Sequence, residues 1–299
     1  MTSGVASATD AGPLTPALSP PGGARGRVVV LCALLSSAAF AAEPSVLRLG
    51  PKVPSPVERV VTLAPSLTDT VLVLGAGKTL VGVSRFDEDP AVAKLPRVGG
   101  FVDPSVESVL ALKPQLLIVQ MSPGNRQAVE KIASLGVSVL AVPMTTVRDV
   151  LEMISEVGAS LGRADEAKQL VASIEAIRAR VRAEGKAKKT HPRVMLIYGF
   201  KPLVVAGPGS FADELLVDLG AVNVSGKAPN PYPVFSLERA VALQPDVVVD
   251  CSDVDDGRAD TKALINKPRW VQPPSRALLQ PGPSLGKGLV ELQKVVYGP

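Results

Sequence analysis

The chain has 299 residues, of which 32 are Lys or Arg and 28 are Asp or Glu, giving a formal net charge of +4. This surplus is spread along the chain instead of forming a basic face with interleaved aromatic residues, which argues against a nucleic-acid-binding protein. A single histidine cannot build a three-histidine zinc cage or an HExxH motif, and Gly75-Ala-Gly77 lacks the third glycine of a dinucleotide fingerprint, so we expect no resident metal and no cofactor.

The first predicted element is a secretory signal. Two arginines precede an apolar run from Val28 to Phe40, which ends in the Ala-Phe-Ala pattern that a signal peptidase accepts. We therefore expect residues 1–42 to be a cleaved signal peptide with an N-terminal extension, and the mature protein to be exported. The run is shorter than the roughly 20 apolar residues that a membrane-spanning helix needs. After cleavage only Cys251 remains, which excludes an intrachain disulfide.

From Val57 onward, short β-branched runs alternate with stretches of helical periodicity. VERVVTL, LVGVS, LLIVQ and VSVLAV are predicted strands, and SLTDTVLVLGAG and VESVLALK are predicted helices. The same order restarts at Arg193 with RVMLIY and continues through LVVAG, FADELLVDLGA, SLERAVALQ and VVVD. This alternation predicts an α/β protein with two Rossmann-like lobes, each with a mainly parallel sheet.

Between Thr145 and Glu184 the sequence carries no strand signal. Apolar residues at helical spacing predict one amphipathic helix over 150–161 and a second that begins at Asp165. A long rigid α-helix holds two lobes at a nearly fixed spacing, which a Gly/Ser linker would not do. The predicted domains are an N-terminal α/β lobe at 43–144, linking helices at 145–190 and a C-terminal α/β lobe at 191–299.

One sequence segment, predicted to form a helix followed by a strand, occurs twice. SVESVLALKPQLLIV begins at Ser105, and SLERAVALQPDVVVD begins 131 residues later at Ser236, which places Glu107 and Glu238 at equivalent positions. The apolar residues beside each glutamate form one helical face, so both acids are expected to point outward. An acid in a first turn also interacts favourably with the helix dipole, so the residues alone leave open whether these glutamates serve only their own helices.

The ordered motifs resemble those of the periplasmic substrate-binding proteins of ABC importers for vitamin B12, ferric siderophores and haem. This is the helical-backbone, class III metal-chelate receptor family. The matching segments, within residues 57–298, are VVTLAPSLTDTVLVLGAG, LVGVSRFDEDP, LPRVGGFVDPSVESVLALKPQLLIV, LVVAGPGSFADELLVDLGAVNV, SLERAVALQPDVVV and PRW. The resemblance implies capture of a metal chelate between the lobes and its delivery to an ABC transporter permease with its ATPase. It further implies that Glu107 and Glu238 dock onto permease arginines, one per lobe, and that Trp270 is a packing residue.

Aromatic residues gather in loops that follow strands or precede the two repeated helices. In open parallel sheets these loops face the crevice where ligands bind. We therefore expect ligand contacts from Phe86, Phe101, Tyr198, Phe200 and Tyr232. Phe101 and Tyr232 each stand six residues before a repeated glutamate, so each lobe offers one aromatic side chain at an equivalent place.

The candidate ligands can be ranked by the side chains that each would need in the cleft. An anionic ferric siderophore would need several basic residues, for which Arg85, Arg126 and Lys201 are the candidates. Haem would need an axial donor, which Tyr198 or Tyr232 could supply. A corrinoid is flat, large and largely uncharged, which suits aromatic walls with few charges. Cobalamin therefore ranks first, a ferric siderophore second and haem third.

A two-lobed enzyme or a ligand sensor without a transporter is the alternative from another class, because fold alone does not specify function. The sequence offers little catalytic chemistry. Ser210 lacks the G-x-S-x-G spacing of a nucleophile elbow, and GAGKT lacks the first glycine of a phosphate-binding loop. We expect a binding protein and no catalytic residues.

Overall fold

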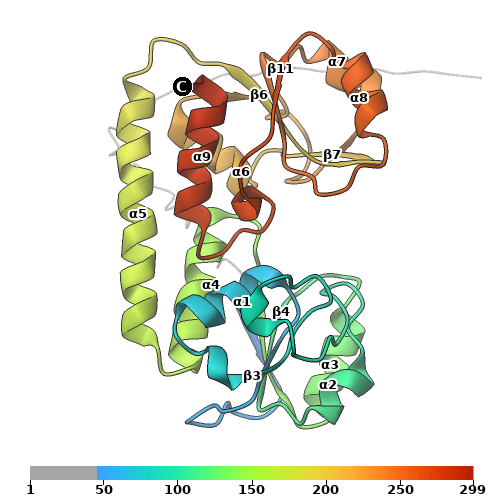
Figure 1. Ribbon diagram of the computed structural model, residues 1–299, viewed down its shortest axis with the longest axis vertical. Helices are drawn as coiled ribbons and strands as arrows, with labels where there is room; N and C mark the ends of the chain where they lie inside the picture. Colours follow the sequence, from blue (N-terminus) through green and yellow to red (C-terminus); the bar gives the residue numbers. More distant parts are fainter. Residues whose placement is uncertain (1–45, 299) are drawn as a thin grey trace, which may run out of the picture. The chain divides into compact units, whose positions relative to one another are not determined.

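The computed structural model describes residues 46–298, so the predicted signal peptide lies outside the described residues. These residues form two α/β lobes, each with its own sheet (Figure 1). Both the two-lobed α/β fold and the long connecting helix are confirmed. Within residues 46–298, none of the helices combines the length and apolar character that crossing a bilayer requires.

The N-terminal lobe contains a five-stranded sheet in the order β1-β5-β4-β2-β3. Neighbouring strands are parallel except for the edge pair of β1 and β5. The strands are β1 (Leu47–Leu49), β2 (Val60–Thr62), β3 (Leu80–Gly82), β4 (Leu116–Gln120) and β5 (Ser138–Val142). The helices are α1 (Pro65–Val73), α2 (Val106–Ala111), α3 (Arg126–Ser134) and α4 (Val147–Ser160), with short 3₁₀ turns η1 (Gly77–Thr79) and η2 (Pro90–Val92).

Helices cover both faces of this sheet, which explains why its central strands are continuous apolar runs. Leu116 and Ile118 of β4 belong to a core shared with α1 and α4. Leu117 and Val119 belong to the core on the opposite face, which α2 and α3 close. Alternate residues of one strand therefore fill two different cores.

The C-terminal lobe has a six-stranded mixed sheet in the order β11-β10-β6-β7-β9, with β8 also paired to β6. Strand β10 is parallel to β6 and β11, whereas β7 is antiparallel to β6 and β9. The strands are β6 (Arg193–Phe200), β7 (Leu203–Val205), β8 (Val222–Asn223), β9 (Val234–Phe235), β10 (Val247–Asp250) and β11 (Arg269–Val271). The helices are α6 (Phe211–Leu219), α7 (Leu237–Ala242), α8 (Arg258–Leu264) and α9 (Leu285–Tyr297), with a 3₁₀ turn η3 (Arg276–Leu278).

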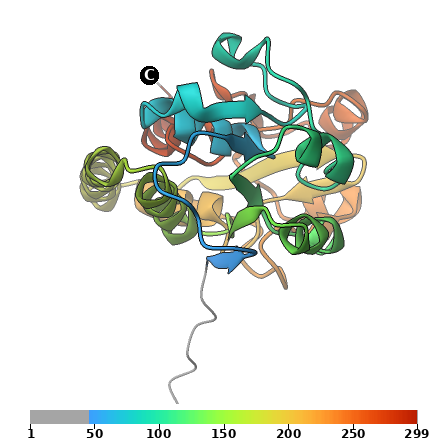
Figure 2. The same ribbon diagram turned by 90° about the horizontal axis from the view of Figure 1, so that it is seen from below.

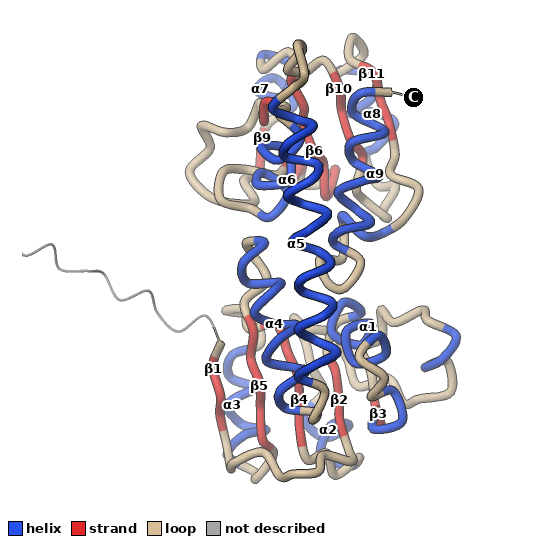
Figure 3. The backbone as a smooth tube through the Cα atoms, turned by 90° about the vertical axis from the view of Figure 1, so that its left-hand side faces the viewer, coloured by secondary structure: helices blue, strands red, loops and turns tan. Residues whose placement is uncertain are grey.

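Helix α5 (Ala164–Lys186) runs alongside both lobes (Figures 1 and 3). It packs against α4 on the N-terminal side and against α6 and α9 on the C-terminal side. In the view from below, α5 (yellow-green) lies at the side of the two sheets and not between them (Figure 2). The linking segment is therefore helical, as its apolar spacing predicts, while the exact domain boundaries stay predictions.

Two kinds of contact fix α5 in place. Arg178 and Arg182 of α5 both bind the carboxylate of Asp218 in α6, at 2.8 and 2.5 Å. Glycines allow close backbone approach, since a Cβ on Gly185 would lie 2.6 Å from the Asp218 carbonyl oxygen, and one on Gly158 would lie 2.4 Å from Ala167 Cβ. Helix α5 therefore has specific contacts with neighbouring helices at both ends.

Candidate functional site

The two lobes enclose a cleft of about 500 Å³. On the N-terminal side its walls come from positions that follow or end parallel strands: Ser66 after β2, Gln120 at the end of β4 and Thr145 after β5. This is the edge of an open parallel sheet at which ligands bind. At the floor the Phe211 N–H donates to the Thr145 carbonyl at 2.6 Å, which joins the lobes directly.

Four of the five predicted aromatic residues line this cleft: Phe86, Phe101, Tyr198 and Tyr232. The rings of Tyr198 and Tyr232 meet edge to face, with centroids 5.7 Å apart and planes at 87°. The Tyr198 ring also meets Phe211 at 6.3 Å and 68°. Such contacts fix ring orientation, so the C-terminal wall presents a rigid aromatic surface.

The two tyrosine hydroxyls differ in their partners. The Tyr198 hydroxyl donates to the Leu278 carbonyl at 3.1 Å, whereas the Tyr232 hydroxyl has no protein partner among the described residues. Burial raises the pKa of both phenols, and at Tyr198 the nearby Cys251 and Tyr232 add to the effect. Both hydroxyls are therefore neutral near pH 7, and Tyr232 is the one free to reach a ligand.

Phe200 does not join the cleft, although it lies two residues after Tyr198 on the same strand. Val194, Leu196 and Tyr198 contact the core beneath α6 and α9, and strict alternation would place Phe200 there too. The pairing of β6 with β7 shifts register between Ile197 and Gly199, and Phe200 instead packs in the opposite core. It is 4% exposed and is not among the residues that line the cleft.

The three basic residues considered for an anionic ligand lie outside the cleft lining. Arg85 forms a two-pronged ion pair with Asp103 at 2.7 and 2.8 Å, which holds the pKa of the Asp103 carboxyl below its usual range. Arg126 pairs with Glu130 on α3, and Lys201 pairs with two aspartates at the start of α8. Each of the three thus has an acidic partner outside the lining, although the Arg85 guanidinium lies 4.8 Å from the ring centroid of Phe86.

Sequence reasoning missed two residues that the structure puts at this site. Asn125, which is fully buried, donates to the Gln120 carbonyl at 2.8 Å and also to the Phe101 carbonyl, so it positions two residues of the wall. Arg276, on η3, is the one basic residue that lines the cleft within the described chain. A polar residue shortly after a strand could have indicated Asn125, but no local pattern marks Arg276.

Residues weighed for other roles have structural functions. Ser210 caps α6 by accepting a hydrogen bond from the Asp213 N–H at 3.1 Å. The exposed His191 has Nδ1 2.6 Å from the Gly220 carbonyl oxygen. Trp270 packs in the C-terminal core and donates from Nε1 to the Ile265 carbonyl at 2.8 Å, as a packing residue would. Cys251 is buried and forms no disulfide with a described residue.

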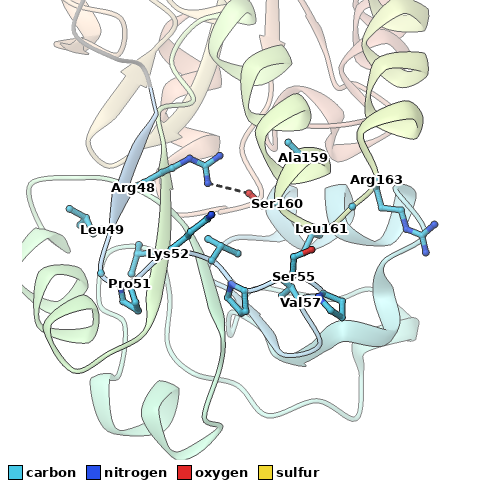
Figure 4. A pocket seen from close by; sticks show the side chains of 16 residues that line it. Arg48, Leu49, Pro51, Lys52, Ser55, Val57, Ala159, Ser160, Leu161 and Arg163 are labelled. Carbon is cyan, nitrogen blue, oxygen red and sulfur yellow. Dashed lines mark hydrogen bonds between the residues drawn. The ribbon is translucent and has the colours of Figure 1, made fainter.

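A larger hollow, of about 780 Å³, lies away from this cleft, where the segment 48–57 meets the turn between α4 and α5 (Figure 4). Its cations are largely neutralised locally, because Arg48 pairs with Glu156 and Arg163 with Glu166. It has no ring cluster and does not lie at the carboxyl ends of the strands. The cleft is therefore the candidate ligand site.

The two repeated glutamates occupy equivalent, exposed positions. Ser105 caps α2 and Ser236 caps α7, each accepting a hydrogen bond at 3.2 Å from the backbone N–H three residues later. Glu107 and Glu238 lie in the first turns of these helices, and neither forms an ion pair with any described residue. Hydrogen bonds from its own backbone and from Ser236 lower the pKa of Glu238, which keeps it charged at neutral pH.

The far ends of these helices are also held in the same way. Arg59, before β2, donates from Nη2 to the Leu112 carbonyl at 2.6 Å, and Arg193, at the start of β6, donates to the Leu243 carbonyl at 2.7 Å. Each arginine satisfies carbonyl groups that the helix end leaves without an intrahelical partner. Each lobe thus presents one exposed glutamate on a short helix that is anchored at both ends.

Comparison with known proteins finds periplasmic and vitamin B12-binding proteins. The periplasmic binding protein family model matches residues 60–272. The vitamin B12-binding protein of Salmonella typhimurium is 31% identical over 194 residues, which cover 64% of this chain and 71% of that protein. A periplasmic haem-binding protein from Pseudomonas aeruginosa is 26% identical with a TM-score of 0.71, covering 81% of this chain and 93% of that one. The apo periplasmic haem-binding protein from Roseiflexus sp. RS-1 is 25% identical with a TM-score of 0.67, covering 81% and 98%.

Proposed function

Because the chain belongs to the periplasmic binding protein family, we propose that it captures a metal chelate in its cleft and delivers it to an ABC importer. Cobalamin or another corrinoid is the favoured chelate. The observation that carries this choice is the character of the cleft. Aromatic rings from both lobes line it, and its only charged lining residues in the described chain, Asp253 and Arg276, pair with each other. A large, flat and nearly uncharged ligand suits such walls.

Haem is the second candidate within the same function. Two solved relatives at 25–26% identity bind haem, and the Tyr232 hydroxyl is available as an axial donor. Ferric siderophores rank below haem, because Arg85, Arg126 and Lys201 do not line the cleft. An enzymatic role is the alternative from another class; among the described residues the cleft lining holds no histidine, lysine or cysteine, and its one carboxylate, Asp253, is paired with Arg276.

The same proposal assigns a permease with its ATPase as the partner. Glu107 and Glu238 would meet permease arginines, one from each lobe, because both are exposed, form no ion pair with a described residue and are fixed on equivalent capped helices. Charges presented at a fixed spacing can set the register of a complex with a two-fold partner. The protein would act in the periplasm after removal of the N-terminal signal.

Ligand capture tests the proposal. The exported protein would be titrated with cyanocobalamin, hemin and ferric siderophores, with native mass spectrometry for stoichiometry and calorimetry for affinity. We expect one cyanocobalamin per chain, bound more tightly than either of the other ligand classes. Tighter binding of hemin would reverse the ranking, and failure to bind any of the chelates would refute the function.

A further inference from the structure

Arg276 connects the two lobes across the cleft. Its Nη1 lies 2.7 Å from Oε2 of Glu88, a residue of the N-terminal lobe that is 188 positions away in the sequence. Its Nη2 contacts the carboxylate of Asp253, which follows β10 in the C-terminal lobe. Each terminal nitrogen of this guanidinium thus has a carboxylate of the protein itself as a partner.

The position of Arg276 is coupled to the aromatic wall. Arg276 begins the turn η3, and Leu278 in the same turn accepts the hydrogen bond from the Tyr198 hydroxyl. Ser275, directly before the turn, donates from Oγ to Glu291 of α9 at 2.5 Å. The guanidinium is therefore carried by an anchored segment next to the rings expected to contact a ligand.

Further negative charge surrounds Arg276 on the N-terminal side. A hollow of about 200 Å³ beside the cleft is lined by Arg276 and by four carboxylates, Asp69, Asp87, Glu88 and Asp89. Burial, together with the charges of Asp87 and Asp89, raises the pKa of Asp69 to about 6. Like charges are thus crowded at this edge, and one arginine does not neutralise them.

These ion pairs contribute little to folding stability. The side chains of Arg276, Asp253 and Glu88 are 38%, 51% and 77% exposed, and exposed pairs stabilise proteins only weakly. Instead, these ion pairs affect which ligand groups can bind beside Arg276. An anionic group on a ligand would have to displace Glu88 or Asp253 from the guanidinium, or accept a hydrogen bond from an N–H group that they do not use, and in either case it would lie next to a carboxylate.

We propose that Glu88 and Asp253 act as a charge filter, which blocks Arg276 and so selects chelates of low net charge over polyanionic chelates. The inference rests on the proposed function and specifies the ligand class of the same cleft. Specificity of this kind comes from an unfavourable contact with the wrong ligand, in addition to favourable contacts with the right one. An uncharged chelate would leave both ion pairs in place.

The test compares two probes on matched variants. The E88Q/D253N protein keeps the size of both side chains but frees Arg276, whereas E130Q/D256N removes one exposed carboxylate from each lobe outside the cleft. Both variants change the net charge by the same amount, so they control for long-range attraction. The probes are cyanocobalamin, which is neutral overall, and hemin, which carries two propionate groups.

At low salt, E88Q/D253N should bind hemin about tenfold more tightly than wild type, because each charge-assisted hydrogen bond to a freed guanidinium contributes strongly. The gain should shrink at high salt, and the ratio of hemin affinity to cyanocobalamin affinity should be higher in E88Q/D253N than in wild type. Adding R276Q to the double variant should abolish the gain. Unchanged hemin affinity in E88Q/D253N, or an equal gain in E130Q/D256N, would overturn the filter.

The outcome separates the filter from the proposed function. A folded wild-type protein that binds no chelate refutes the function alone. The filter is then judged by whether E88Q/D253N, and not E130Q/D256N, acquires hemin binding.

Discussion

Replacing Asp218 by asparagine should loosen helix α5 from the C-terminal lobe. The Asp218 side chain is 1% exposed and binds Arg178 at 2.8 Å and Arg182 at 2.5 Å. Both arginines belong to α5, so this one carboxylate provides two of its polar contacts with α6. Asparagine has almost the same volume, and the substitution therefore removes charge without opening a cavity.

The size of the effect follows from the exposure of the partners. Removing one member of a buried ion pair costs about 3–5 kcal/mol, since the other charge is left uncompensated. Arg178 is 16% exposed and retains a contact with Glu214 at 3.5 Å, while Arg182 is 49% exposed and can be solvated by water. The amide oxygen can also keep one hydrogen bond. We therefore expect a loss of about 2–4 kcal/mol in the free energy of unfolding.

Urea denaturation at pH 7, followed by circular dichroism, measures this loss as a lower midpoint at constant m value. Glu130→Gln is the matched control, because it removes the carboxylate of an exposed pair within α3 and should cost no more than about 0.5 kcal/mol. If Asp218→Asn destabilises the protein no more than this control, the buried ion pairs do not hold α5.

The remaining predictions concern ligand, partner and pH. Phe101→Ala and Tyr232→Ala should each weaken chelate binding by about 1–3 kcal/mol in calorimetry, because a large ring is lost from the wall; unchanged affinity in both would move the site elsewhere. Reversing Glu107 and Glu238 to arginine together should abolish uptake into vesicles carrying the cognate permease while leaving ligand affinity intact, and uptake at wild-type rates would exclude docking through these acids. Because the pKa of Asp69 is raised to about 6, the folded state binds more protons than the unfolded state between about pH 4 and 6. The stability that protonated Asp69 contributes is therefore lost as pH rises through this range. Asp69→Asn should reduce the dependence of the free energy of unfolding on pH between about pH 4 and 6, measured by urea titrations at several pH values.

The sequence by itself determined those helices and strands that follow from the residue pattern of a single short segment. Strands β4 and β5 are apolar at nearly every position because both faces of their sheet are covered. Helices α4 and α5 follow from apolar spacing. The repeat at Ser105 and Ser236 carries its own caps, so two equivalent helices with outward glutamates could be predicted from residue order alone.

Tertiary structure decided which of the candidate residues face the cleft. Phe200 turns away because the register of β6 shifts where it pairs with β7, and a strand's own alternation cannot reveal such a shift. Arg276 has no recognisable motif, since its partners Glu88 and Asp253 come from different lobes and meet it only after both sheets are assembled. Side-chain periodicity encodes which face of an element is buried, but the meeting of distant loops depends on the packing of all the elements between them.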